Sequence, residues 1–191
     1  MAFVNSKVDI IALRHSLKGE DGLLNPEGKT LAAEVWGQIG APKPQLGIRS
    51  GFERTEQTKI AMVGQVPTVQ VDELFFDLSG HEGKLIKDAF AAIGIAGLQE
   101  YRAKVNDETW SAFVSAGQEA WAILLEQIKA SKAANILIIG HGVMLDFIIL
   151  AAIPEAFNEI GNAGLLECEG AQLFLSETGV YACKALRRSD N

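Results

Sequence analysis

Two of the three histidines in the chain lie just beyond short apolar runs. His15 follows the run Val8–Leu13 and has Arg14 immediately before it, and His141 follows the run Ile136–Ile139. Imidazole can act as a nucleophile or a proton carrier, and a guanidinium group binds phosphate oxygens through a planar fork. A lone histidine is most often structural, but two at equivalent positions, one of them beside an arginine, favour a phosphate-handling site.

A second arginine, Arg54, lies in the segment SGFERTEQT at the start of a predicted helix. A positive charge in the first turn opposes the helix dipole, and a bound anion relieves that conflict because helix N-termini bind phosphate well. There are structural alternatives. Arg54 can be a solvated residue paired with Glu53 or Glu56, and Arg14 can make a surface ion pair, typically of ~0–1 kcal/mol.

Short apolar runs alternate with helical patterns along most of the chain, which predicts a three-layer α/β/α sandwich. Its central sheet is expected to be mostly parallel, with a late antiparallel hairpin, and ligands bind such sheets at the carboxyl ends of the strands. Strands are expected at Val8–Leu13, Leu46–Ser50, Thr68–Val71, Ile136–Ile139, Leu165–Leu175 and Val180–Leu186. Helices are expected at Pro26–Ile39, at Glu53–Val63, two or three times within Lys84–Ala130 and from His141 to near Pro154, with Asp72–Gly83 irregular.

The bulk properties favour one globular domain over residues 1–191. The net charge of −7 argues against general binding to nucleic acid or to an anionic membrane surface. Polar residues interrupt every apolar stretch well before the ~18 residues that a membrane span needs, so we expect a cytoplasmic protein. The two cysteines stand outside any metal-ligand pattern and are expected to be buried free thiols.

Four segments match a known family in the right order. Arg14-His15-Ser16 resembles the Arg-His-Gly signature of the histidine phosphatase superfamily, also called phosphoglycerate mutase-like. The segment NPEGK from Asn25 resembles its Leu-Thr-x-x-Gly helix start, and SGFERTEQT resembles its Ser-Pro-Leu-x-Arg-x-x-Gln-Thr segment. The segment NILIIGHGV from Asn135 resembles its late strand followed by His-Gly, so the resemblance spans about residues 8–175.

The resemblance implies a metal-independent phosphatase that works through a phosphohistidine intermediate. His15 would be the nucleophile, and His141 would stabilise charge in the transition state. Arg14, Arg54 and the backbone N–H of Gly142 would hold the phosphoryl oxygens. No cofactor and no metal ion are expected.

The sequence departs from the family pattern at the general acid that protonates the leaving oxygen. Many members carry a glutamate after the third strand, and the aligned position here is Phe76. Asp77 is the nearest carboxylate and is our candidate, with Glu73 and Glu82 as rivals. No aspartate follows His141, so the solution of the acid phosphatase branch is absent.

The sequence departs from the family pattern at two further places, and three other positions could contribute to the site. Ser16 replaces the glycine after the nucleophile and is expected to narrow the pocket, and Ser50-Gly51-Phe52 replaces Ser-Pro-Leu. Lys18 could reach the phosphate, although a solvated lysine is the better expectation, and His81 is expected in an exposed loop. The pair Phe75-Phe76 fits a pocket wall and core packing equally well.

The leading hypothesis is a phosphatase acting on a phosphomonoester or on phosphohistidine, whose imidazole is a good leaving group. The alternatives are a phosphoglycerate mutase-type phosphoryl transfer and a catalytically weak module that binds phosphate for regulation. The expected partner is a small phosphorylated substrate or a phosphoprotein, without nucleic acid or membrane. The oligomeric state stays open, and specificity is expected to come from residues 72–110.

Overall fold

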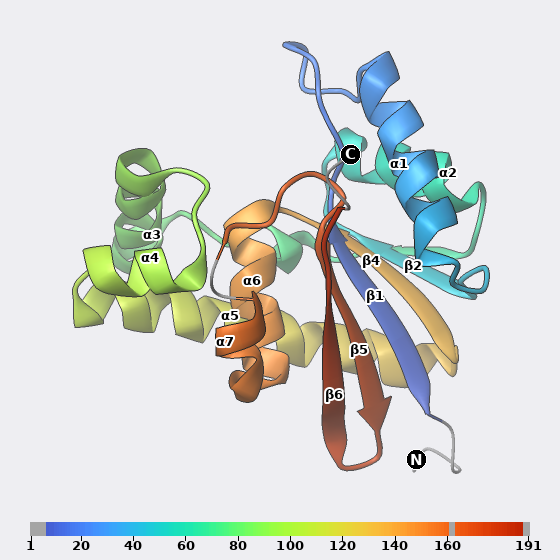
Figure 1. Cartoon of the computed structure of the whole chain (residues 1–191). Helices are drawn as coiled ribbons and strands as arrows, with labels where there is room; N and C mark the ends of the chain where they lie inside the picture. Colours follow the sequence, from blue (N-terminus) through green and yellow to red (C-terminus); the bar gives the residue numbers. More distant parts are fainter. Residues whose placement is uncertain (1–6, 161–162, 189–191) are drawn as a thin grey trace.

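The computed structural model describes residues 7–160 and 163–188 (Figure 1). The described residues form a six-stranded sheet of order β3-β2-β4-β1-β5-β6. The first four strands in that order pair in parallel, and β5 and β6 pair antiparallel to their neighbours. The mostly parallel sheet with a late hairpin is therefore confirmed. Its strands are β1 (Val8–Arg14), β2 (Leu46–Arg49), β3 (Thr68–Gln70), β4 (Asn135–Gly140), β5 (Gly170–Ser176) and β6 (Gly179–Leu186).

Helices cover both faces of this sheet, as the alternating pattern predicts (Figure 1). Helices α1 (Pro26–Ile39) and α2 (Glu53–Val63) lie over one face, and α5 (Asp107–Ser131) and α6 (Gly142–Ala152) lie over the other. Strand β1 serves both layers because its side chains alternate between the two faces. Ile10 packs in the core under α5 and α6, while Ile11 packs in the core under α1 and α2.

Local signals set the bounds of α1 where the sequence predicts them. The Asn25 side chain accepts a hydrogen bond from the Gly28 N–H, and Pro26 occupies the first helical position. Gly40 ends the helix with a φ of 64°, the left-handed conformation that glycine adopts without a Cβ penalty.

The region between β3 and α5 contains more helix than the sequence predicts. A short 3₁₀ turn η1 (Asp72–Leu74) follows β3, and α3 (Gly80–Ile93) begins inside the segment expected to be irregular. Helix α4 (Leu98–Lys104) follows, and α3 and α4 lie beside the end of α5 that extends beyond the sheet (Figure 1). A second 3₁₀ turn η2 (Pro154–Ala156) and the short α7 (Phe157–Ile160) come after α6.

The expected strand at Leu165–Leu175 begins only at Gly170, so its first part was wrong. Residues 163–169 instead form a loop that curls around the end of β1. Cys168 has a φ of 63°, which breaks the extended backbone, and its N–H donates to the Arg14 carbonyl. Gly170 then passes so close to β1 that a Cβ there would lie 1.8 Å from the Ala12 carbonyl oxygen. This loop places its backbone and side chains beside Arg14.

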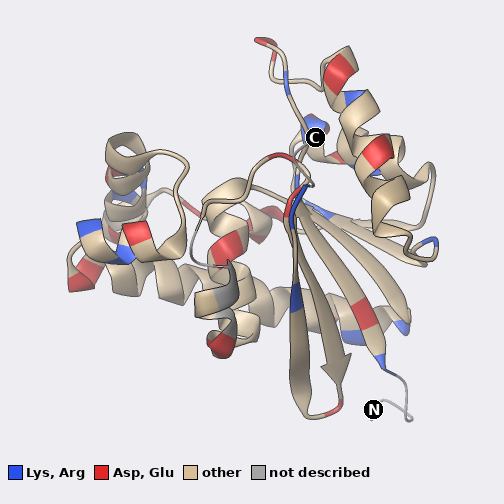
Figure 2. Ribbon diagram, in the orientation of Figure 1, with Lys and Arg blue, Asp and Glu red and all other residues tan. Residues whose placement is uncertain are grey.

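Charged residues are sparse on the strands and frequent on the helices and loops (Figure 2). Within the described ranges, no helix combines the length and the apolar character needed to cross a bilayer.

Candidate active site

The register of the sheet brings the two strand-end histidines together. Arg14 on β1 lies opposite Gly140 on β4, so the next residue of each strand, His15 and His141, emerges at the same level. The two rings meet edge to face with centroids 5.2 Å apart. The parallel pairing of β1 with β4 thus produces the neighbourhood that the sequence could only suggest.

His15 is held as a neutral imidazole with one ring nitrogen unbonded among the described residues. Its Nδ1 lies 2.8 Å from the carbonyl oxygen of Ser16, which can only accept, so Nδ1 carries the proton. Burial, with the nearby charges of Arg54 and Arg14, lowers the His15 pKa from 6.5 to about 4, against the opposing effects of the Ser16 bond and Glu167. Nε2 therefore keeps its lone pair at neutral pH, as a nucleophile requires.

His141 is fixed from both sides. The Arg54 Nη2 lies 3.2 Å from its Nδ1, so Nδ1 accepts, and Nε2 donates to the Ser50 hydroxyl at 2.8 Å. Burial, followed by the neighbouring His15, Arg54 and Arg14, lowers the pKa of His141 to about 2. Ser50 is fully buried and was not among the predicted site residues, although it opens the motif SGFERTEQT. Its place after β2, level with the other strand ends, was the signal that could have found it.

Arg54 lacks an acidic partner among the described residues. Its Nε is buried without any hydrogen-bond partner in that part of the chain. The guanidinium lies 4.3 Å from the centre of the Phe52 ring, and burial and Arg14 lower its pKa. Burying an unpaired N–H donor on a cation without a counter-charge costs free energy. An anion beside His15 would accept a hydrogen bond from Arg54 and also neutralise its charge.

Arg14 is also buried, but it has a carboxylate partner, Glu167, which no sequence motif indicates. Its Nη1 donates to the Leu165 carbonyl at 2.7 Å, and its Nη2 pairs with Glu167 at 2.9 Å. Both partners lie in the loop 163–169, and the expected strand Leu165–Leu175 includes the last five residues of this loop. No local pattern marks Glu167, because only the tertiary fold brings that loop to the end of β1.

Gly142 stands where the sequence predicts it. It is the first residue of α6, so its N–H is among those that have no partner within the helix. A Cβ on it would lie 3.6 Å from the Arg14 Nε, so the backbone here runs against the arginine side chain.

The matched motifs also support the loop that carries His15. The Ser16 N–H donates to the Thr58 hydroxyl, and the Ser16 hydroxyl donates to the Gly28 carbonyl at 2.7 Å. The hydroxyl thus turns toward α1, and the narrowing of the pocket by Ser16 stays a prediction. The Gln57 side chain accepts from the Leu24 N–H at 2.7 Å and ties the same loop to α2.

The three candidate acids lie in different surroundings. Asp77 is exposed, and bonds from the Ser79 N–H and hydroxyl lower its pKa. Glu73 and Glu82 line a cavity beside α5, and Asp77 lines both that cavity and a second one next to Phe52. Asp77 is thus the one of the three carboxylates that shares a cavity with Phe52, but its bonds from Ser79 keep it ionised at neutral pH.

The smaller candidates are also placed by the fold. Lys18 is exposed, and His81 is an exposed partner of Glu108 at 2.9 Å. Phe76 is buried in the main core, whereas the Phe75 ring lies 5.1 Å from the ring of His141. One member of the phenylalanine pair packs in the core and the other forms a wall of the site.

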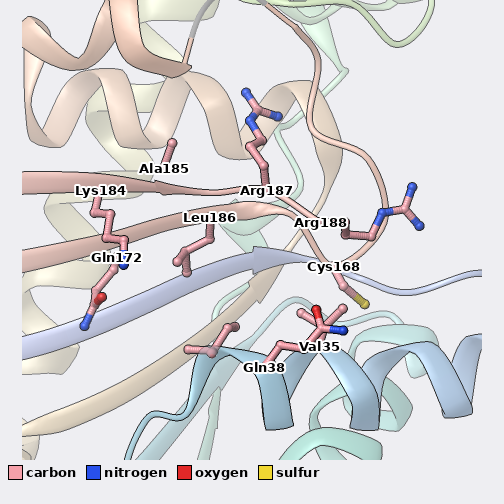
Figure 3. A pocket seen from close by; sticks show the side chains of 10 residues that line it. Val35, Gln38, Cys168, Gln172, Lys184, Ala185, Leu186, Arg187 and Arg188 are labelled. Carbon is pink, nitrogen blue, oxygen red and sulfur yellow. The ribbon is translucent and has the colours of Figure 1, made fainter. Parts of the chain in front are cut away.

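A separate cavity of about 330 Å³ lies between α1 and β6 (Figure 3). Lys184, Arg187 and Arg188 line it with Cys168 and Gln172. Arg187 pairs with Glu169 at 3.0 Å, so part of this positive charge is neutralised. None of the residues predicted for the site lines this cavity.

Comparison with solved structures identifies the fold. No protein-family model and no curated protein matches the chain. A phosphoglycerate mutase from Bacillus anthracis aligns over 96% of this chain and 94% of its own, with a TM-score of 0.66 and 13% identity. A phosphoserine phosphatase from Entamoeba histolytica, in complex with 3-phosphoglyceric acid, aligns over 95% and 98%, with a TM-score of 0.63 and 17% identity. A mycobacterial glucosyl-3-phosphoglycerate phosphatase with VO3 aligns over 96% and 100%, with a TM-score of 0.62 and 16% identity.

These neighbours belong to the histidine phosphatase superfamily, and the chain has its phosphoglycerate mutase-like fold. The fold class predicted from the sequence is therefore confirmed, and the fold is the one that the four motifs indicate. At 13–17% identity, the likeness to these phosphatases and this mutase shows a shared fold.

Proposed function

We propose that the protein is a metal-independent phosphatase that acts through a phosphohistidine intermediate on a phosphomonoester or phosphohistidine substrate. The observation that carries the proposal is the pairing of a neutral His15, with Nε2 free, and Arg54, whose buried Nε has no partner among the described residues. A dianionic phosphoryl group between them would meet a nucleophile and an unneutralised cation together.

In the first step the His15 Nε2 attacks phosphorus, and the bond from phosphorus to the leaving oxygen breaks. Arg54, Arg14 and the Gly142 N–H would hold the phosphoryl oxygens as charge spreads over them. His141 lies beside His15 as a neutral imidazole that Ser50 and Arg54 hold in one orientation, and it would stabilise the charge that develops in the transition state. In the second step water attacks phosphorus, the P–N bond breaks, and inorganic phosphate leaves with His15 restored.

The leaving oxygen must gain a proton, and Asp77 is our candidate donor. Asp77 is exposed and its pKa is lowered, so it is rarely protonated at neutral pH and is a poor general acid there. Asp77→Asn should therefore lower kcat by less than about tenfold for a substrate with a good leaving group, because general acid catalysis typically supplies ~10²–10⁴-fold when it is fully used. A loss above a hundredfold would show that Asp77 is the main acid.

The test of the function is hydrolysis of p-nitrophenyl phosphate in the presence of a chelator. His15→Ala should abolish turnover, and His81→Ala should leave it unchanged because His81 is an exposed partner of Glu108. Rapid quenching with a radiolabelled substrate should trap a protein phosphate that is stable in alkali and lost in acid, as a phosphohistidine is.

A regulatory module that binds phosphate is the second candidate, and the ionised state of Asp77 is the observation that favours it. Absence of hydrolysis across alkyl, aryl and phosphoimidazole substrates, together with calorimetric binding of inorganic phosphate that Arg54→Gln weakens, would establish that candidate instead.

A further inference from the structure

Two phenylalanine rings extend the site beyond the histidines. The rings of Phe52 and Phe75 lie 4.9 Å apart, and each centre is 5.1 Å from the His141 ring. Phe52 also carries the Arg54 guanidinium over its face and is 38% exposed. An exposed aromatic ring that contacts two site residues presents an apolar surface to whatever binds beside them.

This aromatic wall borders an open cleft of about 410 Å³. The cleft has apolar walls and two carboxylates, and no lysine or arginine lines it among the described residues. A second anionic group on the substrate would meet repulsion here, whereas an uncharged or cationic group would not. The side chains that line the cleft are Phe52, Phe75, Phe76, Leu78, Asp72 and Asp77.

The leaving-group chemistry points in the same direction as the cleft. Bonds from the Ser79 N–H and hydroxyl lower the pKa of Asp77, the candidate acid, so its carboxyl rarely carries the proton that a leaving group needs. A phenol has a pKa of about 10, so a phenolate leaves with far less help from an acid than an alkoxide does. A site with weak acid catalysis is therefore best matched to an aromatic leaving group.

We propose that the phosphate ester processed here carries an aromatic ring next to the phosphoryl group, and that the ring is uncharged or cationic. The ring would pack against Phe52 and Phe75 in the cleft while the phosphoryl group lies at His15. This inference rests on the proposed phosphatase activity and narrows its substrate to aryl phosphates without a second anionic group. A small aryl phosphate and a phosphotyrosine side chain share this chemistry.

Three substrates separate the role of the ring from that of the leaving group. Phenyl phosphate should have a KM about 10- to 100-fold below that of glycerol phosphate, since burying an aromatic ring is favourable by that ratio. Benzyl phosphate keeps the ring but leaves as an alkoxide, so its KM should match that of phenyl phosphate while its kcat falls. A phosphotyrosine peptide then decides between the small-molecule and the protein source.

The aromatic wall is tested by Phe75→Ala. The variant should raise the KM for phenyl and benzyl phosphate at least fivefold and leave the KM for glycerol phosphate within twofold. Phe174→Ala is the matched control, because Phe174 lies on β5 and its ring contacts Tyr181. If Phe75→Ala fails to fold, Phe75→Leu should give a smaller change in the same direction.

The charge preference is tested with 4-carboxyphenyl phosphate and O-phosphotyramine, an anionic and a cationic aryl phosphate. O-phosphotyramine should have the higher kcat/KM, and Asp72→Asn should shrink the ratio between the two several-fold. Asp88→Asn makes the same charge change on the exposed surface of α3 and should leave the ratio unchanged.

The outcomes distinguish the two proposals. Equal KM values for phenyl and glycerol phosphate, or preference for 3-phosphoglycerate or another doubly anionic ester, would overturn the aromatic assignment while leaving the phosphatase intact. No hydrolysis of any ester, including p-nitrophenyl phosphate, would overturn the phosphatase and the inference with it.

Discussion

The Nη2 of Arg14 and the Oε1 of Glu167 form an ion pair at 2.9 Å within the candidate site. Arg14 is therefore partly neutralised before any ligand arrives, unlike Arg54. Glu167 also raises the pKa of His15, so its negative charge reaches the nucleophile. A phosphoryl dianion at His15 has to share Arg14 with this carboxylate and is repelled by it.

Glu167→Gln should strengthen the binding of inorganic phosphate. Removing the carboxylate removes its repulsion and frees one face of the Arg14 guanidinium, so the inhibition constant of phosphate should fall about three- to tenfold. Competitive inhibition of p-nitrophenyl phosphate hydrolysis measures it. Glu126→Gln, on the exposed surface of α5, supplies the control for the change in net charge. Unchanged or weaker phosphate binding would argue that Glu167 holds Arg14 in its binding position.

Ser50→Ala should impair catalysis without touching the nucleophile. The hydroxyl accepts from the His141 Nε2 in a fully buried place, so its loss leaves a buried N–H unsatisfied. The cost is about 1–3 kcal/mol of unfolding free energy, with a fall of roughly tenfold in kcat because His141 loses its fixed orientation. Urea denaturation and steady-state kinetics measure the two effects. An unchanged kcat would show that Ser50 serves folding alone.

Gly28→Ala should destabilise the protein, although alanine is normally the better helix former. A Cβ at Gly28 would lie 2.1 Å from the Leu17 carbonyl oxygen, which forces α1 away from the loop that carries His15 and Ser16. We expect a loss of about 1–3 kcal/mol by thermal or urea unfolding. Gly37 is the matched control on the same helix, because a Cβ there meets nothing within 4 Å. Gly37→Ala should stabilise by roughly 0.5–1 kcal/mol.

The free energy of unfolding should decrease as the pH is lowered below about 6.5, because of the two buried histidines. An unfolded histidine binds a proton below 6.5, whereas folded His15 and His141 stay neutral down to about 4 and about 2. The unfolded state thus binds more protons in that window, and each histidine lowers the unfolding free energy by at most ~1.4 kcal/mol per pH unit of acidification.

The contribution of one histidine is measured by comparing the wild type with His141→Asn. Between pH 4.5 and 5.5 the variant should show a pH slope that is smaller by about 1 kcal/mol per unit. The two proteins are compared because burial raises the pKa of Asp146 well above its ordinary value. The titration of Asp146 therefore changes stability with pH in the direction opposite to that of the histidines, and it does so equally in both proteins. Equal slopes in the two proteins would mean that folded His141 takes up a proton in this range.

The sequence by itself determined the order of the elements and the pair of histidines at the ends of β1 and β4. These features depend on local patterns, since apolar runs, the Asn25 cap and Gly40 act within a few residues. Helix α2 likewise has the predicted bounds, Glu53–Val63. The motif order also indicated the fold that the solved structures confirm.

The tertiary structure alone decided what surrounds those histidines. The Arg14–Glu167 pair, the Ser50–His141 bond and the wall of Phe52 and Phe75 join residues far apart in the chain. No local periodicity encodes such contacts, because they follow from strand register and from loops whose paths depend on packing. The same reason explains the error at residues 165–169, where a strand is predicted but contacts with the end of β1 fix a loop.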